Sequence, residues 1–344
     1  MQRCIQLALK GAGYVAPNPM VGAVLVYNDT IIGEGYHQQF GQAHAEVNCI
    51  NAVPEQLQHL ISSSILYVSL EPCAHYGKTP PCVDLILQRQ IKKVVVGCTD
   101  SFEKVNGAGI QKLQAAGVAV VVGVLESACV TLNKRFFTFH QKKRPFVLLK
   151  WAQSNDGFIA GDGGIPIHIS NEYSNRLVHQ LRATEAAILV GSTTVINDNP
   201  QLNTRKWIGK HPTRLIIDPQ LKIGNDAHIY DGTTPTIIFN KIKNDYQLNV
   251  QWVKVDADQN YMDSVFTFCY QQQLNSIIIE GGSKTLQSFI DAGMWDEAIV
   301  ITNTHLQIHR GITSPILKNH QLVNIQTIQT DNICYYSNLN NELL

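Results

Sequence analysis

The chain has 344 residues, of which 44% are hydrophobic, and this length is enough for two domains with separate cores. Lysine plus arginine and aspartate plus glutamate each number 27, so the formal net charge is zero. A neutral chain has no general attraction for a nucleic-acid backbone or an anionic membrane, and neither is expected as a partner. Eight cysteines without a compact regular spacing indicate reduced thiols, not a disulfide framework.

The amino-terminal residues give no sign of a targeting segment. The first ten residues, MQRCIQLALK, hold one arginine and a short apolar stretch that ends at Lys10. This stretch is too short for the core of a signal peptide, and no later run reaches transmembrane length. We therefore expect a cytoplasmic protein.

The first 125 residues alternate short β-rich runs with helical segments. We expect strands at residues 21–26, 65–70, 92–98 and 118–123, and helices at residues 42–53, 82–90 and 108–116. This alternation is typical of a layered α/β domain.

A second α/β unit is expected after a basic and aromatic segment that ends at Arg144 and Pro145. We place the domain boundary there, which gives domains of residues 1–143 and 144–344. In the second domain we expect strands at residues 146–153, 186–191, 213–219, 235–240 and 275–282, and helices at residues 171–182, 262–273 and 283–291.

The most specific motif of the first domain combines one histidine, one glutamate and two cysteines. The triplet His44-Ala45-Glu46 is followed by Cys73 and Cys82. One imidazole and two thiolates supply the three protein ligands of a catalytic zinc site and leave a fourth position for water. Glu46 is then available to move a proton from this water, whose pKa zinc lowers, to a leaving group. The pattern is typical of zinc-dependent deaminases.

A simpler interpretation of the same residues is a buried histidine, a surface glutamate and two inert core cysteines. Eight residues separate Cys73 from Cys82, where the short form of the motif has two, so the sequence pattern by itself is also compatible with a lost site.

Two polar segments of the second domain suit phosphate groups. No G-x-G-x-x-G fingerprint follows a predicted strand, so a Rossmann dinucleotide site is not expected. The turn from Glu280 to Thr285 joins an apolar strand to a helix, where backbone N–H groups bind phosphate, although such turns often have no ligand. A second loop runs from Asp198 to Arg205, with Arg182 before it, and paired arginines suit a phosphate monoester. Alternatively, Arg182 caps a helix and Arg205 pairs with Asp198.

The first domain resembles the deaminase half of bifunctional riboflavin biosynthesis enzymes of the bacterial RibD type. The resemblance rests on the run from Asn18 to Gly22, on the triplet from His44 to Glu46, and on the segment from Glu71 to Cys82 with its long loop between the cysteines. It implies a cytidine-deaminase-like three-layer fold. It also implies zinc on His44, Cys73 and Cys82, Glu46 as the catalytic proton shuttle, and a substrate pocket lined by Asn18, His75 and Thr79.

The resemblance weakens after residue 98. The family usually has an aspartate-proline loop and then a basic residue between two glycines, whereas this chain reads Asp100-Ser101-Phe102 and Gly107-Ala108-Gly109. A basic phosphate contact is therefore missing at Ala108, and Lys104 and Lys112 are the candidates to replace it.

The second domain resembles the reductase half of the same enzymes in four segments, residues 148–160, 179–195, 198–205 and 280–289. The resemblance implies a dihydrofolate-reductase-like α/β fold with NADPH as the cofactor. The implied substrate-binding residues are Lys150, Pro166, Arg182, Leu202, Arg205 and Glu280. The implied NADPH-binding residues are Ala152, His168, Thr194, Asp198, Gly282, Ser283, Lys284, Thr285, Leu286, Gln287 and Ser288. Pro166 and His168 stand where the family often has serine and tryptophan.

The resemblance implies two reactions on small-molecule pyrimidine ribosyl phosphates. The first is zinc-dependent hydrolytic deamination of 2,5-diamino-6-(5-phosphoribosylamino)pyrimidin-4(3H)-one to 5-amino-6-(5-phosphoribosylamino)uracil. The second is NADPH-dependent reduction of the ribosyl to the ribityl phosphate. Asp198 is the nearest candidate proton donor for this step, and orientation of the sugar hydroxyls is the alternative role for it. A homo-oligomer, either a dimer or a tetramer, is expected from the family alone.

Three alternatives remain open from the sequence. A structural zinc would make the first domain a binding module, although a structural site normally has four protein ligands and Glu46 argues for catalysis. A nucleic-acid deaminase is disfavoured by the neutral charge. A deaminase with an inactive reductase domain is the third alternative, because of Pro166 and His168.

Overall fold

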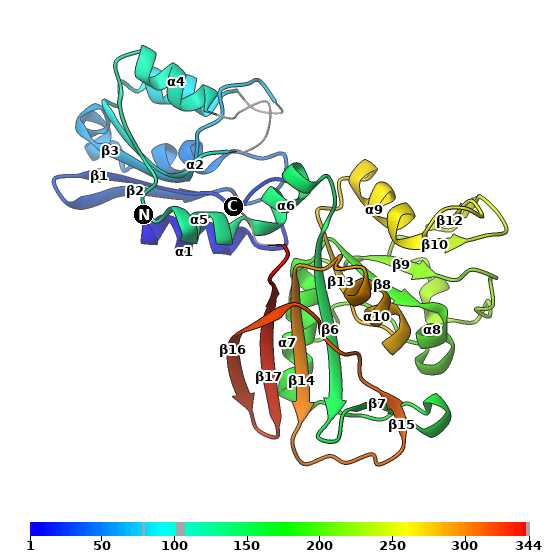
Figure 1. The fold of residues 1–344 in the computed structure, drawn as a ribbon. Coiled ribbons are helices and arrows are strands. Elements are labelled where there is room, and N and C mark those ends of the chain that lie inside the picture. The colour runs from blue at the N-terminus through cyan, green and yellow to red at the C-terminus, as the bar shows by residue number, and fades with distance from the viewer. Residues whose placement is uncertain (78–79, 101–106, 342–344) are drawn as a thin grey trace. The chain divides into compact units, whose positions relative to one another are not determined.

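The computed structural model describes residues 1–77, 80–100 and 107–341, which form two compact units (Figure 1). The first unit runs from Met1 to Lys143, and the second begins at Arg144. Each unit has its own sheet and its own buried core. The division follows α6 (Lys134–Lys142), which lies in the basic and aromatic segment.

The first unit is built on a five-stranded sheet with the order β2-β1-β3-β4-β5. The strands are β1 (Gly22–Tyr27), β2 (Thr30–Tyr36), β3 (Ile65–Leu70), β4 (Lys93–Cys98) and β5 (Ala119–Val122). Strands β3, β4 and β5 are parallel, whereas β1 pairs antiparallel with β2 and β3. The carboxyl ends of β3 and β4 therefore lie at one edge of the sheet, and the segments that follow them meet there.

Helices cover both faces of this sheet. They are α1 (Gln2–Ala8), α2 (Ala45–Asn51), α3 (Cys82–Gln88), α4 (Ala108–Ala115) and α5 (Glu126–Leu132), with 3-10 turns at Leu9–Gly11 and Glu55–Ser63. On one face, Ile50 of α2 and Leu113 of α4 join the main core. On the other face, Cys4 of α1 and Cys129 of α5 are fully buried in two smaller clusters. The result is the three-layer α/β arrangement predicted from the sequence.

The second unit is built on a ten-stranded sheet with the order β11-β12-β10-β9-β8-β13-β6-β14-β17-β16. The strands are β6 (Phe146–Ser154), β8 (Ala187–Gly191), β9 (Thr213–Ile217), β10 (Thr236–Asn240), β11 (Asp245–Gln247), β12 (Val250–Lys254), β13 (Ser276–Ile279), β14 (Glu297–Asn303), β16 (His320–Ile328) and β17 (Asp331–Asn338). The seven strands from β12 to β14 in this order are parallel. A separate two-stranded sheet pairs β7 (Phe158–Gly161) with β15 (Gly311–Thr313).

Both faces of the parallel strands are buried, which explains their continuous apolar runs. One face is covered by α9 (Tyr261–Gln271) and α10 (Ser283–Asp291), and the other by α7 (Glu172–Thr184) and α8 (Ser192–Asp198). Short 3-10 turns lie at Asp162–Gly164 and His228–Tyr230. Among the described residues, none of the helices combines the length and apolarity needed to cross a membrane.

The sequence did not predict β2, which is an edge strand of the first unit's sheet. Its segment TIIGEGY contains Gly33 and Gly35, which weaken the strand pattern. A Cβ at Gly35 would lie 2.2 Å from the backbone nitrogen of Cys49, so the glycine allows α2 to pack directly on the strand. The sequence also gave no prediction for α1, α5 and α8.

A buried ion pair joins the starts of β6 and β14. The two terminal nitrogens of Arg144 donate hydrogen bonds of 2.7 Å to the two carboxylate oxygens of Asp296. The backbone N–H of Val147 donates a third, of 2.8 Å, to the same carboxylate. Only 9% of the Arg144 side chain and 5% of the Asp296 side chain are exposed. Removing one partner would leave the other as a buried charge without a counter-charge.

We expect Asp296→Asn to lower the free energy of unfolding of the second unit by about 3–5 kcal/mol, because Arg144 loses its buried counter-charge. Urea unfolding followed by tryptophan fluorescence measures this, since all four tryptophans lie after residue 150. The control is Glu172→Gln, which removes the exposed pair with Arg176 and should cost less than about 1 kcal/mol. Equal losses in the two variants would contradict the prediction.

Candidate functional site

Three potential zinc ligands of the first unit converge at the carboxyl end of β3. His44 precedes α2, Cys73 follows β3, and Cys82 is the first residue of α3. His44 Nδ1 lies 3.5 Å from Cys73 Sγ and 3.4 Å from Cys82 Sγ. The three ligand atoms lie within 4.8 Å of one another, and within the described part of the chain this is the one such group. An imidazole and two thiols at this spacing fit the ligand preference of zinc.

The environment of Cys73 favours the thiolate form that binds metals. A hydrogen bond from the Cys82 thiol lowers the pKa of Cys73 to about 4, and the neighbouring His44 acts in the same direction. The backbone N–H of Cys82 also donates to Cys73 Sγ over 3.3 Å. The start of α3 therefore stabilises a negative charge at the position where a metal ligand is needed.

Glu46 lies in the first turn of α2, two residues after His44, and only 3% of it is exposed. Burial raises the pKa of the Glu46 carboxyl to about 7, and the nearby Cys73 acts in the same direction. A cation on the neighbouring ligands would favour the ionised carboxylate instead. The ionised carboxylate is the form that accepts a proton, as a proton shuttle must.

Glu71, directly after β3, organises the loops around these residues, although the sequence assigned it no separate role. Its carboxylate accepts hydrogen bonds of 2.9–3.3 Å from the backbone N–H groups of Asp100, Gly107, Gly109 and Ile110. A Cβ at Gly109 would lie 2.1 Å from the Pro72 carbonyl oxygen, so α4 approaches the strand end only with glycine there. The signal in the sequence was the glutamate directly before Pro72-Cys73.

Of the three predicted substrate-binding residues of the first unit, the structure describes Asn18 and His75. Asn18 Nδ2 lies 3.2 Å from Nε2 of His37, whose ring centroid is 5.4 Å from that of His44. His37 was not predicted, and its 2% exposure shows that it is part of the buried wall. His75 has a buried Nδ1 that finds no hydrogen-bond partner among the residues that the structure describes. Thr79 lies outside the described residues.

Lys104 and Lys112 are the candidates to replace the missing basic contact at Ala108, and the structure describes only Lys112. Ala108 is the first residue of α4. Lys112, one turn later, forms an ion pair of 2.6 Å with Asp84 of α3. Lys104 lies outside the described residues.

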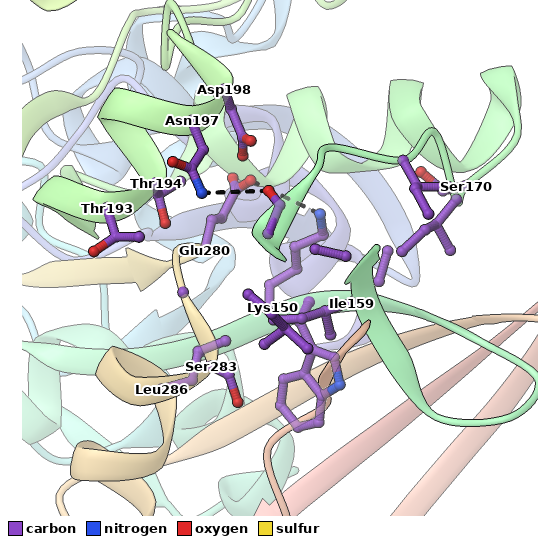
Figure 2. A pocket seen from close by; sticks show the side chains of 18 of the residues that line it. Lys150, Ile159, Ser170, Thr193, Thr194, Asn197, Asp198, Glu280, Ser283 and Leu286 are labelled. Atoms are coloured by element: carbon purple, nitrogen blue, oxygen red, sulfur yellow. Dashed lines mark hydrogen bonds and ion pairs between the residues drawn. The ribbon is translucent and has the colours of Figure 1, made fainter. Parts of the chain in front are cut away.

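A cavity of about 370 Å³ opens in the second unit beside the carboxyl ends of β8 and β13 (Figure 2). Figure 2 shows Thr194 and Asp198 of α8, Lys150 of β6 and Ser283 of α10 around this space. The predicted residues that line it are Lys150, Ala152, His168, Thr194, Asp198, Glu280, Gly282, Ser283 and Leu286. The predicted residues outside the lining are Pro166, Arg182, Leu202, Arg205, Lys284, Thr285, Gln287 and Ser288. Thr193 and Asn197 line the cavity but were not predicted.

Two glycines allow the starts of α8 and α10 to pack closely together. Gly282 has a φ of +68°, and a Cβ there would lie 3.3 Å from Thr194 Oγ1. A Cβ at Gly191 would lie 2.8 Å from Thr285 Oγ1. The first N–H groups of the nine-residue helix α10 have no partner within the helix and favour anions. Gly282 and Ser283 line the cavity, so this helix start fits the diphosphate of a dinucleotide such as NADPH.

Glu280 is the electrostatic centre of the second unit's site. Nε and Nη2 of Arg182 donate hydrogen bonds of 2.7 Å to its two oxygens, and Lys150 Nζ lies 3.8 Å away. Burial alone would raise the pKa of Glu280, but Arg182 and Lys150 outweigh this effect and lower it to about 2. Glu280 is therefore an anion at neutral pH and not a proton donor in this arrangement.

The loop after α8 brings a second arginine to this cluster. Nη1 of Arg182 donates to the Asn203 carbonyl oxygen over 3.2 Å, and Nη1 of Arg205 donates to Asn203 Oδ1 over 3.3 Å. Leu202 is 2% exposed with a φ of +51°, so its side chain is in the core and its backbone turns the loop. Lys150 and Arg182 carry two positive charges against the one negative charge of Glu280, and the exposed Arg205 adds a third cation on the adjoining loop.

Two protein families match the two units. The cytidine and deoxycytidylate deaminase zinc-binding region matches residues 1–98, and the RibD C-terminal domain matches residues 145–306. The riboflavin biosynthesis protein RibD of Aquifex aeolicus is 38% identical over 87% of this chain and 85% of its own length. RibD of Escherichia coli is 33% identical over the same shares of the two chains.

Solved structures match the whole fold. The diaminohydroxyphosphoribosylaminopyrimidine deaminase/5-amino-6-(5-phosphoribosylamino)uracil reductase of Thermotoga maritima aligns with a TM-score of 0.90 and 34% identity. RibD of Acinetobacter baumannii aligns with a TM-score of 0.87 and 32% identity. Each alignment covers 98% of this chain and 97% of the other.

These matches extend over both units and therefore over both reactions predicted from the sequence. Nothing in them favours an inactive reductase, and the second unit keeps a cavity lined by Lys150 and Glu280. The protein is thus an enzyme with two activities, a deaminase that uses Zn²⁺ and a reductase that uses NADPH. The chain belongs to the RibD family of bifunctional riboflavin biosynthesis enzymes.

Proposed function

We propose that His44, Cys73 and Cys82 hold the zinc of the deaminase and that Glu46 is its proton shuttle. A bound zinc ion supplies the Lewis acidity that makes water nucleophilic near neutral pH. Glu46 accepts a proton from the attacking water and delivers it to the departing amine. The observation that carries this proposal is the burial of Glu46 beside three ligand atoms within 4.8 Å of one another.

The pocket around these residues binds the pyrimidine in our proposal. Asn18 and His75 contact the pyrimidine or its ribose phosphate, together with Thr79. The contact between Asn18 and His37, whose ring lies beside that of His44, supports the position of Asn18. The unpartnered Nδ1 of His75 supports a polar ligand there, because a buried polar atom normally has a hydrogen-bond partner.

In the second unit we propose that the cavity holds the reactive part of NADPH, which supplies the hydride. The cofactor contacts are those of Ala152, His168, Thr194, Asp198 and the run from Gly282 to Ser288. Burial raises the pKa of the Asp198 carboxyl, and this supports Asp198 as the candidate proton donor for the reduction.

The substrate of the reductase binds in our proposal with its phosphate at the arginines. Lys150, Arg182, Arg205 and Glu280 form the contacts, together with Pro166 and the backbone at Leu202. Three cations and one anion leave two positive charges, which match a phosphate monoester dianion. The fully ionised Glu280 accepts hydrogen bonds from Arg182 and remains available to a sugar hydroxyl.

We further propose a cytoplasmic homo-oligomer, either a dimer or a tetramer. Reduced thiols at Cys73 and Cys82 require a reducing compartment to remain metal ligands. Strand β16 is at the edge of its sheet and exposes Leu322, Val323 and Ile325, which supports a contact with another subunit.

We expect Glu46→Gln to lower the rate of ammonia release by about 10²–10⁴-fold, because the amide cannot carry the proton. Ammonia release and NADPH absorbance are measured separately with the diaminopyrimidine ribosyl phosphate and with its deaminated product. Zinc content and reduction of the supplied deaminated product should remain at the wild-type level. Unchanged ammonia release with bound zinc would exclude Glu46 as the shuttle.

We expect Arg205→Gln to raise the KM of the reductase for its phosphorylated substrate by about 10–100-fold, which corresponds to a lost charged hydrogen bond. The matched control is Lys206→Gln, which removes the adjacent exposed cation and should change the KM less than about twofold. Steady-state reduction assays at fixed NADPH measure both variants. A similar KM in the two variants would remove Arg205 from the phosphate site.

A further inference from the structure

A strap of residues 311–318 runs along α10, and none of the predicted site residues lies on it. Ser283, Gln287 and Asp291 of α10 follow one another at intervals of four residues, so their side chains lie on one face of the helix. All three side chains bind the strap. This polar face of α10 therefore fixes the path of the strap.

Ser283 and Asp291 hold the two ends of the strap. Ser283 Oγ donates a hydrogen bond of 2.8 Å to the Thr313 carbonyl oxygen. Lys318 Nζ donates one of 2.7 Å to Asp291 Oδ1 and forms an ion pair with it. The first of these contacts lies at the start of α10, and the second lies at its end.

Both ends of the Gln287 amide are engaged in the middle of the strap. Its Nε2 donates to the Ile316 carbonyl oxygen over 3.3 Å and to Asp291 Oδ1 over 3.0 Å. Its Oε1 accepts a hydrogen bond of 2.9 Å from the Ile316 N–H group. Gln287 is also outside the lining of the cavity. Its side chain is therefore committed to the strap and not to the space where a cofactor binds.

The strap brings Ile312 to the cavity. Its first three residues form β15, which pairs antiparallel with β7 (Figure 1). A Cβ at Gly311 would overlap the Ala160 carbonyl oxygen, so this close pairing requires glycine. Ile312 lines the cavity, and its Cδ1 would lie 3.4 Å from a Cβ at Gly164. The Ile312 side chain therefore extends from the strap toward the loop that contains Gly164.

We propose that Ile312 is an apolar contact of NADPH in the reductase cavity and that Ser283, Gln287 and Asp291 position it through the strap. The inference rests on the proposed function, because it requires the cofactor to bind in this cavity. It deepens that function in one respect: Gln287 is a positioning residue, and its side chain does not touch the cofactor.

The surroundings of Ile312 suit the nicotinamide ring of the cofactor. Trp151 of β6, Ile159 of β7 and Leu286 of α10 are apolar and line the same cavity. An aromatic ring gains affinity from such a surface, whereas the charged substrate needs the cations beside Glu280. Ile312 also adjoins Thr313, which is bound at the start of α10, where the diphosphate of the cofactor fits. The strap therefore places Ile312 on the cofactor side of the cavity.

Steady-state reduction by the full-length zinc-loaded protein tests this inference through the KM for NADPH. Ile312→Ala should raise this KM about tenfold and change kcat less than about twofold, because the lost contact is the same in the ground and transition states. Ile312→Val removes one methylene from the side chain and should raise the KM about threefold. The control is Gln271→Ala at the exposed end of α9, which should change neither constant. An unchanged KM for NADPH in Ile312→Ala would overturn the inference.

A double-mutant cycle distinguishes positioning from direct contact for Gln287. Gln287→Ala releases the strap at Ile316 and should raise the KM for NADPH about threefold to fivefold. If Gln287 acts through Ile312, the double variant should have a KM within about twofold of Ile312→Ala alone. If the two effects multiply in full, Gln287 acts independently of Ile312, and the positioning role is overturned.

Thr194→Val separates the failure of this inference from failure of the proposed cofactor site, because Thr194 lines the cavity from α8. If Thr194→Val raises the KM for NADPH while Ile312→Ala raises only the KM for the phosphorylated substrate, the cofactor site stands and this inference alone is overturned. If neither variant changes the KM for NADPH, the cofactor does not bind in this cavity and both proposals fail.

Discussion

A buried carboxylate at the end of a parallel strand is the constraint on which the second unit's site depends. An ionised Glu280 without partners would cost several kcal/mol in this interior. Arg182 of α7 and Lys150 of β6 offset that cost, so α7, β6 and the end of β13 must meet at one point. The same meeting point fixes one wall of the cavity. The interaction that stabilises the buried charge therefore also fixes the positions of Arg182 and Lys150.

The first unit uses a buried carboxylate in a comparable position but with different partners. Glu71 follows β3 and is satisfied by four backbone N–H groups instead of by cations. These bonds join the ends of β3 and β4 to the start of α4, and they hold the chain just before Cys73. In both units the candidate site lies at the carboxyl ends of parallel strands, as is general for open α/β sheets.

The sequence predicted those parts of the protein whose signal is local. The central strands are continuous apolar runs, and the three candidate zinc ligands, which the structure brings within 4.8 Å of one another, stand out by residue type within short motifs. His37 was missed because its contacts come from distant segments, since it lies beside Asn18 and His44. Strand β16 was missed for another reason. It is at the sheet edge and almost wholly exposed, so it has no buried face that would make apolar and polar residues alternate along it.

Pro166 and His168 stand where the family often has serine and tryptophan. Both residues belong to the loop over the cavity and not to the charged cluster around Glu280. Backbone contacts hold this loop, because Gly161 N–H donates to the Ile165 carbonyl oxygen over 2.9 Å and Asn197 Nδ2 donates to the Gly164 carbonyl oxygen over 3.3 Å. Neither contact depends on the side chain at position 166 or 168. The loop can therefore tolerate substitutions there. Glu280 and the cations paired with it cannot be exchanged singly, because each exchange would leave a buried charge without its partner.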